Sequence, residues 1–293
     1  MSESNISNNG TVVPFFLKSN SNSQHLIRGR VASIGKPVTS ILKRHSYPEI
    51  IGVLQAEALA ISACLSSMLD FEGIFTLQAK GDGPVSTLFA DINDLGHLRG
   101  YCAFGTSYAE IDQLTLSYVT GNSACLKSLM GDGYIAVTVQ ETASGGRYQG
   151  IAELGERSLS QAAMHWFEKS AQLETLVMSA AGNGTFGWEA KAVVLQNVAF
   201  DGGQSVEGLK KLSTDINYSE EEDFWLMAKT LMSTITHNEL IDPNLGPEEI
   251  IFRLFNTMSP QITEACLVVD QCRCNNTKVE SMIEKMAPDE IEK

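Results

Sequence analysis

The sequence predicts an α+β protein built on antiparallel β-sheet, with helices placed between the strands. Short β-rich segments follow one another across turn signals rich in glycine, aspartate and proline, which is typical of meanders and hairpins. Segments with apolar residues three and four positions apart interrupt these runs and indicate helices. The chain has 293 residues and is 43% hydrophobic, which is enough for one large core and a smaller appended unit.

The first predicted elements are a strand over residues 25–33 and, after a Gly-Lys-Pro turn, a helix over residues 38–45. Pro48 then begins a long helix, because proline is favoured in the first helical turn. The apolar positions of this helix leave almost no polar face, so we expect it in the core.

Three strands follow as a meander, and a Gly-Asp-Gly-Pro turn separates the first two. A short helix and a hairpin come next. A helix with Ser158 as its N-cap and two further strands complete the predicted core. These elements span residues 71–79, 85–92, 97–104, 124–129, 134–140, 147–152, 158–170, 173–179 and 189–198. Antiparallel runs interrupted by helices predict an α+β core over residues 25–200.

The segments on either side of this core differ from it in composition. Residues 1–24 begin with a Ser/Asn-rich stretch and are predicted to be a disordered tail. A glycine-rich segment without periodicity follows the core and leads to two helices, over residues 220–238 and 247–256. We interpret residues 201–256 as a helical linker. Residues 257–293, which hold three crowded cysteines, are predicted to be a small separate unit.

Charge and targeting signals limit the partners. The net charge is −14 and no long basic run is present, so the surface repels phosphate backbones and nucleic acid is not expected as a partner. We find no run of about 18 apolar residues and expect no membrane partner. The N-terminus lacks a secretory signal, so we expect a cytoplasmic protein with reduced thiols.

The sharpest chemical signal is the motif Cys272-Arg273-Cys274. Two thiolates one residue apart can both reach one metal ion, and structural zinc takes four ligands in a tetrahedron, so the motif supplies half a site. A bare Cys-x-Cys motif is incidental as often as it is part of a metal site. Cys266 is a possible third ligand, but its apolar neighbours favour a buried, inert cysteine.

Signals for catalysis are weak. The chain has no phosphate loop, no Gly-x-Ser-x-Gly elbow and no His-Glu-x-x-His helix. Cys102 or Cys125 would serve as a nucleophile only if its thiol pKa were lowered and a base such as His97 lay nearby. Core packing is the favoured interpretation of both cysteines and of Cys64. We therefore expect no enzyme, and a cysteine-dependent enzyme is kept as the alternative.

One stripe of the helix over residues 220–238 is apolar. Its members are Phe224, Met227, Leu231 and Ile235. In the favoured interpretation, this stripe packs on the core. In the other, the linker is metastable and exposes the stripe to a binding partner.

Several short motifs stand in a fixed order from residue 25 to the C-terminus. They are His25-Leu26-Ile27-Arg28-Gly29-Arg30-Val31, Tyr47-Pro48, Phe71-Glu72-Gly73, Leu77-Gln78, Gly81-Asp82-Gly83-Pro84, Leu98-Arg99-Gly100, Gly131-Asp132-Gly133-Tyr134, Arg147-Tyr148-Gln149-Gly150 and Ser170-Ala171-Gln172-Leu173. Each motif alone is weak, but the ordered set is specific. It resembles the redox-regulated heat-shock chaperone family, also called the 33 kDa chaperonin.

The resemblance implies an ATP-independent holdase of the stress response that binds unfolding or oxidatively damaged proteins and prevents their aggregation. It implies an α+β core, a helical linker folded over it and a small C-terminal zinc domain. In such a protein Cys272 and Cys274 are two of the four ligands of one zinc ion. Oxidation turns these thiols into disulfides, zinc is released, and the linker with its stripe becomes available to clients. The resemblance also implies a homodimer on activation.

Two features depart from the family pattern. The other two expected ligands belong to a Cys-x-x-Cys pair that these residues do not contain, so the zinc site is incomplete. Truncation is our favoured explanation, and natural loss of the pair is the other. Residues 189–192 read Glu-Ala-Lys-Ala where the family tends to have an Ala-Gly-Gly-like stretch, which puts a local turn or bulge in doubt. A zinc-stabilised scaffold without a redox switch is the second alternative function.

Overall fold

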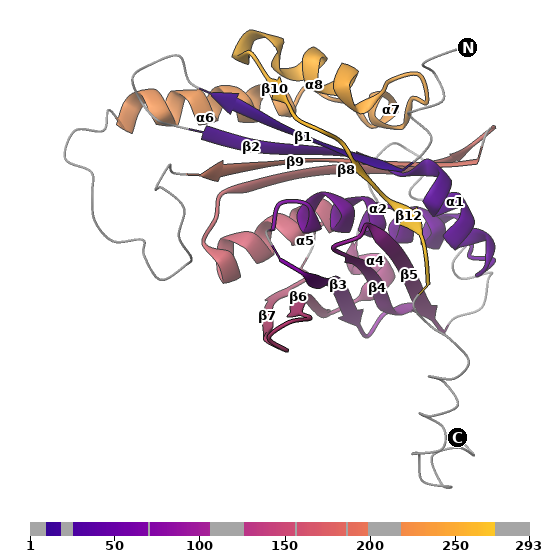
Figure 1. Ribbon diagram of the computed structural model, residues 1–293. Coiled ribbons are helices and arrows are strands. Elements are labelled where there is room, and N and C mark those ends of the chain that lie inside the picture. The colour runs from indigo at the N-terminus through magenta and orange to yellow at the C-terminus, as the bar shows by residue number, and fades with distance from the viewer. Residues whose placement is uncertain are drawn as a thin grey trace, which may run out of the picture.

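The computed structural model describes residues 10–18, 26–69, 71–105, 126–155, 157–185, 187–198 and 218–272. In this part of the chain, two largely antiparallel sheets lie on either side of a layer of helices, and further helices cover the outer face of one sheet (Figure 1). The predicted α+β class with antiparallel sheets is therefore confirmed. We call the sheet between the two helical layers the upper sheet and the other the lower sheet.

The upper sheet runs in the order β10-β1-β2-β9-β8, and β11 also pairs with β1. Its strands are β1 (Thr11–Lys18), β2 (Leu26–Ser33), β8 (Thr175–Gly184), β9 (Gly187–Val198), β10 (Gln261–Ile262) and β11 (Cys266–Leu267). β9 passes through residues 189–192 with unbroken pairing to β8, so the unusual sequence there introduces no bulge.

The lower sheet runs in the order β12-β5-β4-β3-β6-β7 and contains the predicted meander and hairpin. Its strands are β3 (Gly73–Gly81), β4 (Val85–Asn93), β5 (His97–Phe104), β6 (Gly133–Glu141), β7 (Arg147–Glu153) and β12 (Val269–Asp270). The two Gly-Asp-Gly turns meet, because the Asp132 N–H donates to Asp82 Oδ1 at 2.7 Å. Turn chemistry therefore explains both motifs.

The layer between the sheets is organised by α2 (Glu49–Ser66), which begins after Pro48 as predicted. It contacts strands of both sheets, while α1 (Gly35–Lys43) and α5 (Leu159–Trp166) flank it and α4 (Leu126–Met130) lies near β4. By length and composition α2 could cross a membrane, so our statement that no such stretch exists is wrong. Since 83% of this helix is buried inside the protein, its apolar surface serves as the core of both sheets.

A carboxyl group is buried within this core. Glu57, on α2, is 1% exposed. Burial raises the pKa of Glu57 to about 8, and a hydrogen bond with Ser179 opposes the shift only in part. Glu57 is therefore largely protonated in the folded protein at neutral pH, whereas it would be ionised in the unfolded chain.

Replacing Glu57 with glutamine should flatten the pH dependence of stability. The pKa of Glu57 in the folded protein lies above its ordinary value of 4.5. The contribution of Glu57 to the free energy of unfolding is therefore complete below pH 4.5 and is lost as the pH rises toward 8. One such group contributes a slope of at most about 1.4 kcal/mol per pH unit. Urea unfolding at several pH values would measure the slope, with Glu168→Gln on the surface as the control. Equal slopes for Glu57→Gln and the parent protein would contradict this prediction.

The outer face of the upper sheet is covered by α6 (Tyr218–Met232), α7 (His237–Ile241) and α8 (Pro247–Phe255), which we call the linker helices. The helix predicted over residues 220–238 is interrupted after Met232, because Thr236 forms a capping box with Glu239 and starts α7. A second apolar core lies between these helices and the sheet, and there the rings of Phe15 and Phe255 stack at 5.5 Å.

The prediction of a disordered tail over residues 1–24 is wrong for residues 11–18, which form β1. This segment reads Thr-Val-Val-Pro-Phe-Phe-Leu-Lys, and it pairs with β2 over its whole length. The Ser/Asn-rich composition ends near residue 10, and the apolar residues that follow are typical of a strand. Pro14, which cannot donate a hydrogen bond, lies between the residues that pair with β10 and β11, and its carbonyl accepts from Thr263 N at 3.0 Å.

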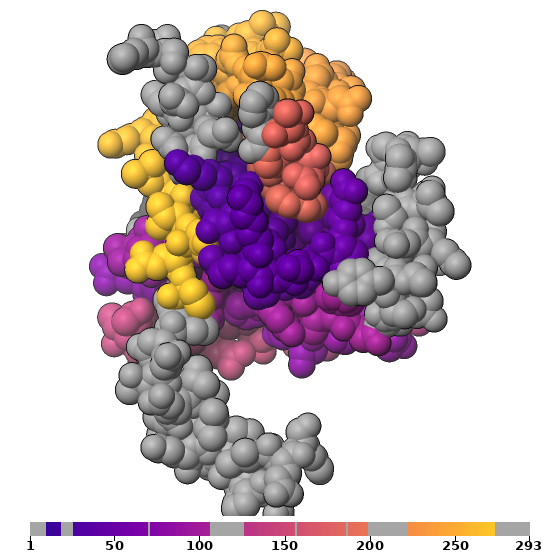
Figure 2. All heavy atoms as spheres, turned by 90° about the vertical axis from the view of Figure 1, so that its right-hand side faces the viewer, coloured from indigo at the N-terminus to yellow at the C-terminus, as the bar shows by residue number. Residues whose placement is uncertain are grey.

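Residues 259–272, which we call the edge segment, lie along the edges of both sheets. β10 and β11 pair with β1, and β12 then pairs in parallel with β5. Figure 2 shows this yellow segment running down one side of the molecule beside the indigo N-terminal elements. Residues 257–293 were predicted to form a separate unit, but their described part, up to Cys272, packs on the core.

Candidate functional site

The predicted metal and redox cysteines lie at the end of the edge segment. Cys272 is exposed and follows β12 by two residues, and Cys274 lies outside the described residues. Asp270, in β12, fixes this end of the segment to α1. Its carboxylate accepts hydrogen bonds from Arg44 at 2.5 and 2.7 Å and from Ser40 Oγ at 2.5 Å. Cys272 is thereby presented at the surface beside α1.

The charges around Cys272 come from this anchor. Partial burial raises the pKa of Asp270, but the hydrogen bonds from Arg44 and Ser40 outweigh it, so the pKa lies below its ordinary value. The hydrogen bond to Asp270 raises the pKa of Arg44, and the nearby Cys272 adds to this shift. Cys272 therefore lies close to the ion pair of Arg44 and Asp270.

Of the two cysteines predicted to bind zinc, the described residues include only Cys272. Structural zinc takes four ligands. Over the described ranges, no group of three or more His, Cys, Asp or Glu side chains is placed to hold a metal ion. Cys272 and Cys274 have the right donor chemistry for two of the four positions, and the other two would have to come from outside these ranges.

Cys266 is not the buried cysteine that its apolar neighbours predicted. It is exposed, as is Leu267, and only Val268 of this run is buried. The reason is that β11 is a two-residue strand at the sheet edge, where the side chains on both faces meet solvent. Apolar sequence alone does not distinguish such an edge from a core strand.

The core cysteines confirm the packing interpretation. Cys64 and Cys102 are buried, and burial raises the pKa of each thiol to about 12. Both thiols therefore stay protonated at neutral pH, which removes their nucleophilicity. His97 lies five positions before Cys102 on β5, so the two side chains point to opposite faces, and His97 contacts Asn93 instead. Cys125 lies outside the described residues.

The apolar stripe on α6 faces the sheet, but its register differs from the prediction. Trp225 and Met232 are buried against the upper sheet, together with Ile235 beyond the helix end. Phe224 and Leu231 are half-buried at the margin of the second core, whereas Met227 is 41% exposed, so its assignment to the stripe is wrong. Positions 225, 228 and 232 have helical spacing too, and the tryptophan among them was the available signal.

Sequence reasoning missed a buried cation under the linker helices. Lys191, on β9, is 1% exposed. It lies within residues 189–192, where the sequence departs from the family pattern. Its Nζ donates to the carbonyl oxygens of Asp242 at 2.6 Å and Leu245 at 2.8 Å, in the connection between α7 and α8. Burial lowers the pKa of Lys191, and Glu189 with other nearby carboxylates opposes the shift. One charged side chain thus joins the sheet to the linker helices.

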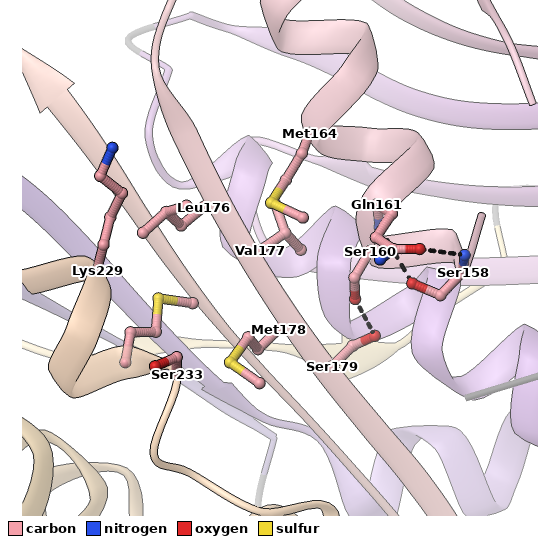
Figure 3. A pocket seen from close by; sticks show the side chains of 11 residues that line it. Ser158, Ser160, Gln161, Met164, Leu176, Val177, Met178, Ser179, Lys229 and Ser233 are labelled. Atoms are coloured by element: carbon pink, nitrogen blue, oxygen red, sulfur yellow. Dashed lines mark hydrogen bonds between the residues drawn. The ribbon is translucent and has the colours of Figure 1, made fainter. Parts of the chain in front are cut away.

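A groove lies along β8, between α5 and α6 (Figure 3). It consists of two cavities of about 350 and 510 Å³ that share Gln161, Met164, Leu176 and Lys229 in their walls. Ser160 and Ser179 meet at its floor, where their hydroxyl oxygens lie 2.7 Å apart. We call this feature the β8 groove.

Comparison with known proteins gives a consistent result. A family model described as "Hsp33 protein" matches residues 16–293. The 33 kDa chaperonin of Caulobacter vibrioides is 30% identical over 269 residues, which cover 90% of this chain and 83% of the relative. That of Pseudoalteromonas translucida is 28% identical over 252 residues, covering 86% of this chain and 78% of the relative.

The crystal structure of the 33 kDa chaperonin from Thermotoga maritima has the same fold. The two structures superpose with a TM-score of 0.73 at 15% sequence identity, covering 96% of this chain and 87% of that chain. At this identity the likeness shows the fold alone.

Proposed function

Since the chain belongs to the Hsp33 family, we propose that it is a redox-regulated, ATP-independent holdase that binds unfolding or oxidatively damaged proteins. Membership in a family of chaperonins supports a chaperone function. The observation that carries the finer proposal is that helices docked over an apolar sheet face are continuous with the segment ending at Cys272. The helices that cover the proposed client surface and the cysteines of the proposed switch thus belong to one stretch of chain.

The client surface in this proposal is the second core. Under the linker helices, the upper sheet presents a continuous apolar face from three strands. Its buried members include Val13, Phe15, Leu17, Ile27, Val31, Val193 and Leu195. When the helices are docked this face is closed, and when they leave it becomes a large apolar patch of the kind that binds other polypeptides. The stripe residues Phe224, Leu231 and Ile235 would become available with it.

The switch in this proposal is the oxidation of Cys272 and Cys274. Peroxide takes two electrons from one thiolate, which gives a sulfenic acid and hydroxide. A second thiol then attacks the sulfenic sulfur, and a disulfide forms with loss of water. Zinc, when bound, would be held by Cys272 and Cys274 with two ligands from outside the described residues, and it would keep these thiolates in place.

The edge segment provides the route from the cysteines to the linker helices. It contacts the core through short strands and a few hydrogen bonds, including Val269 N to Gly96 O at 2.9 Å and Gln271 N to Leu98 O at 3.2 Å. Disturbing the chain at Cys272 would loosen β12 first, then β11 and β10, which follow α8 closely along the chain. We propose a cytoplasmic protein that forms a homodimer when activated.

Light scattering of a heat-unfolding client protein tests this function. The protein should leave the client to aggregate when reduced and should suppress scattering after peroxide treatment. Cys272→Ser should abolish the difference between the two states, whereas Cys266→Ser, an exposed cysteine of the same segment, should preserve it. Equal protection in both states would favour a scaffold without a switch. Absence of protection in either state would rule out the holdase.

A further inference from the structure

β8 is an edge strand whose outer side is open. The upper sheet ends at β8, and in the part of the chain that the structure describes no strand pairs with that outer side. At the opposite edge β10 and β11 cover β1, and in the lower sheet β12 covers β5. An open edge presents a row of backbone donors and acceptors, which is a template for one more strand.

The β8 groove gives this edge two apolar walls. Met164 of α5 lies on one side of the strand, and Trp225 and Met232 of α6 lie on the other. Leu176 and Met178 of β8 itself point into the space between them (Figure 3). The opening is therefore shaped for an extended chain that pairs with β8 and places alternate side chains against apolar surface.

The composition of these walls favours occupants of varied sequence. Three methionines, Met164, Met178 and Met232, line the first cavity. The flexible and polarisable methionine side chain adapts to ligands of different shape, and surfaces rich in it bind many partners. An unfolded polypeptide is such a partner, because it offers an extended backbone and apolar side chains without a fixed order.

Charge favours an unfolded protein over a second copy of this chain as the partner that binds in the β8 groove. The walls carry two cations, Arg157 and Lys229, and two carboxylates, Glu168 and Glu174, so the groove is nearly neutral. A second copy of this chain has a net charge of −14, and the neutral groove offers it no basic surface to bind. A neutral groove accepts client segments of either sign.

The same sheet already accepts an extended segment at its other edge. The edge segment adds to β1 through short strands, with hydrogen bonds such as Thr263 N to Pro14 O at 3.0 Å and Val268 N to Gly10 O at 2.6 Å. From these observations we infer that the β8 groove binds an extended apolar segment of an unfolded client by strand addition to β8. The inference rests on the proposed holdase function and names its contact site.

Release of the linker helices would not remove this site. α6 forms one wall of the groove, so its departure widens the opening. The edge of β8 and Met164 of α5 belong to the core and stay in place. The experiment is therefore done with the full chain after peroxide activation.

Met178→Lys places an ammonium group in the groove and should raise the chaperone concentration needed for half-protection by roughly tenfold, because the charge would lose water when a client strand binds. Ile151→Lys is the matched control. Ile151 is 57% exposed on β7, the edge strand of the lower sheet, and it lines neither cavity of the β8 groove. Circular dichroism would show that both variants are folded.

A photo-cross-linking residue at position 178 or 151 gives a second measurement that does not depend on the lysine variants. Cross-links to client from position 178, and few from 151, are expected. If position 178 makes no client cross-link and Met178→Lys protects like the parent protein, the groove is not the contact site while the holdase function stands. Cross-links between two copies would also overturn the inference. If the parent protein protects no client, both proposals fall together.

Discussion

Replacing Lys191 with methionine should weaken the docking of the linker helices by about 2–4 kcal/mol, because one buried and one partly buried carbonyl group lose a charged donor. These carbonyls belong to Asp242 and Leu245, and Lys191 is the side chain that joins them to β9. Methionine has a similar length and no donor, so the sheet would keep its packing while the connection between α7 and α8 lost its attachment. The reduced variant should then protect clients that the reduced parent protein does not.

Hydrogen exchange of the amides in α7 and α8 measures this effect directly, and client light scattering measures its consequence. Lys169→Met, at an exposed lysine beyond α5, is the matched control and should change neither. Unchanged exchange in the linker helices of Lys191→Met would show that apolar contacts alone hold them. Faster exchange without client protection would separate docking from activity.

Phe255→Ala should destabilise the docked state even more, by about 3–5 kcal/mol, which is the usual cost of removing a buried phenylalanine. Phe255 is fully buried on α8 and stacks on Phe15. Phe15 in turn packs directly on Gly29, where an added Cβ atom would come within 2.1 Å of the ring, so Phe255 and Gly29 together hold this ring in place. We expect premature release of the linker helices on heating.

The same helix supplies the control for this prediction. Phe252 is 52% exposed on α8, so Phe252→Ala makes the same chemical change without opening a cavity. It should alter stability by less than about 0.5 kcal/mol. Limited proteolysis of the linker during a thermal ramp would compare the two variants. Equal cleavage temperatures would mean that α8 is not held by its buried face.

Long periodic elements of the fold could be predicted from the sequence, and short edge elements could not. The apolar pattern of α2 and the turn signals of the lower sheet led to the correct elements, because each reflects burial of a whole face. β10, β11 and β12 have two residues each, which is too short for any pattern. Their places are set by pairing with strands that are distant in sequence.

For the candidate site, sequence reasoning found the Cys272 end and the linker helices but not what holds them. The predicted stripe on α6 wrongly included Met227 in place of the neighbouring buried position. Several sets of apolar positions on that helix have helical spacing, so the sequence did not distinguish between them. Lys191 was noticed only as a departure from a family pattern. Its role depends on burial by α7 and α8, which arrive about 50 residues later in the chain, and no local pattern encodes that contact.

The place of β1 in the upper sheet has a consequence for synthesis on the ribosome. One neighbour of β1 is β2, which follows it directly, but its neighbours on the other edge, β10 and β11, are made about 250 residues later. The sheet cannot close on that side until residues 261–267 have left the exit tunnel. Contacts of such long sequence separation slow folding. One edge of this apolar strand therefore stays unpaired while the intervening residues are made, and an unpaired strand edge is prone to aggregation.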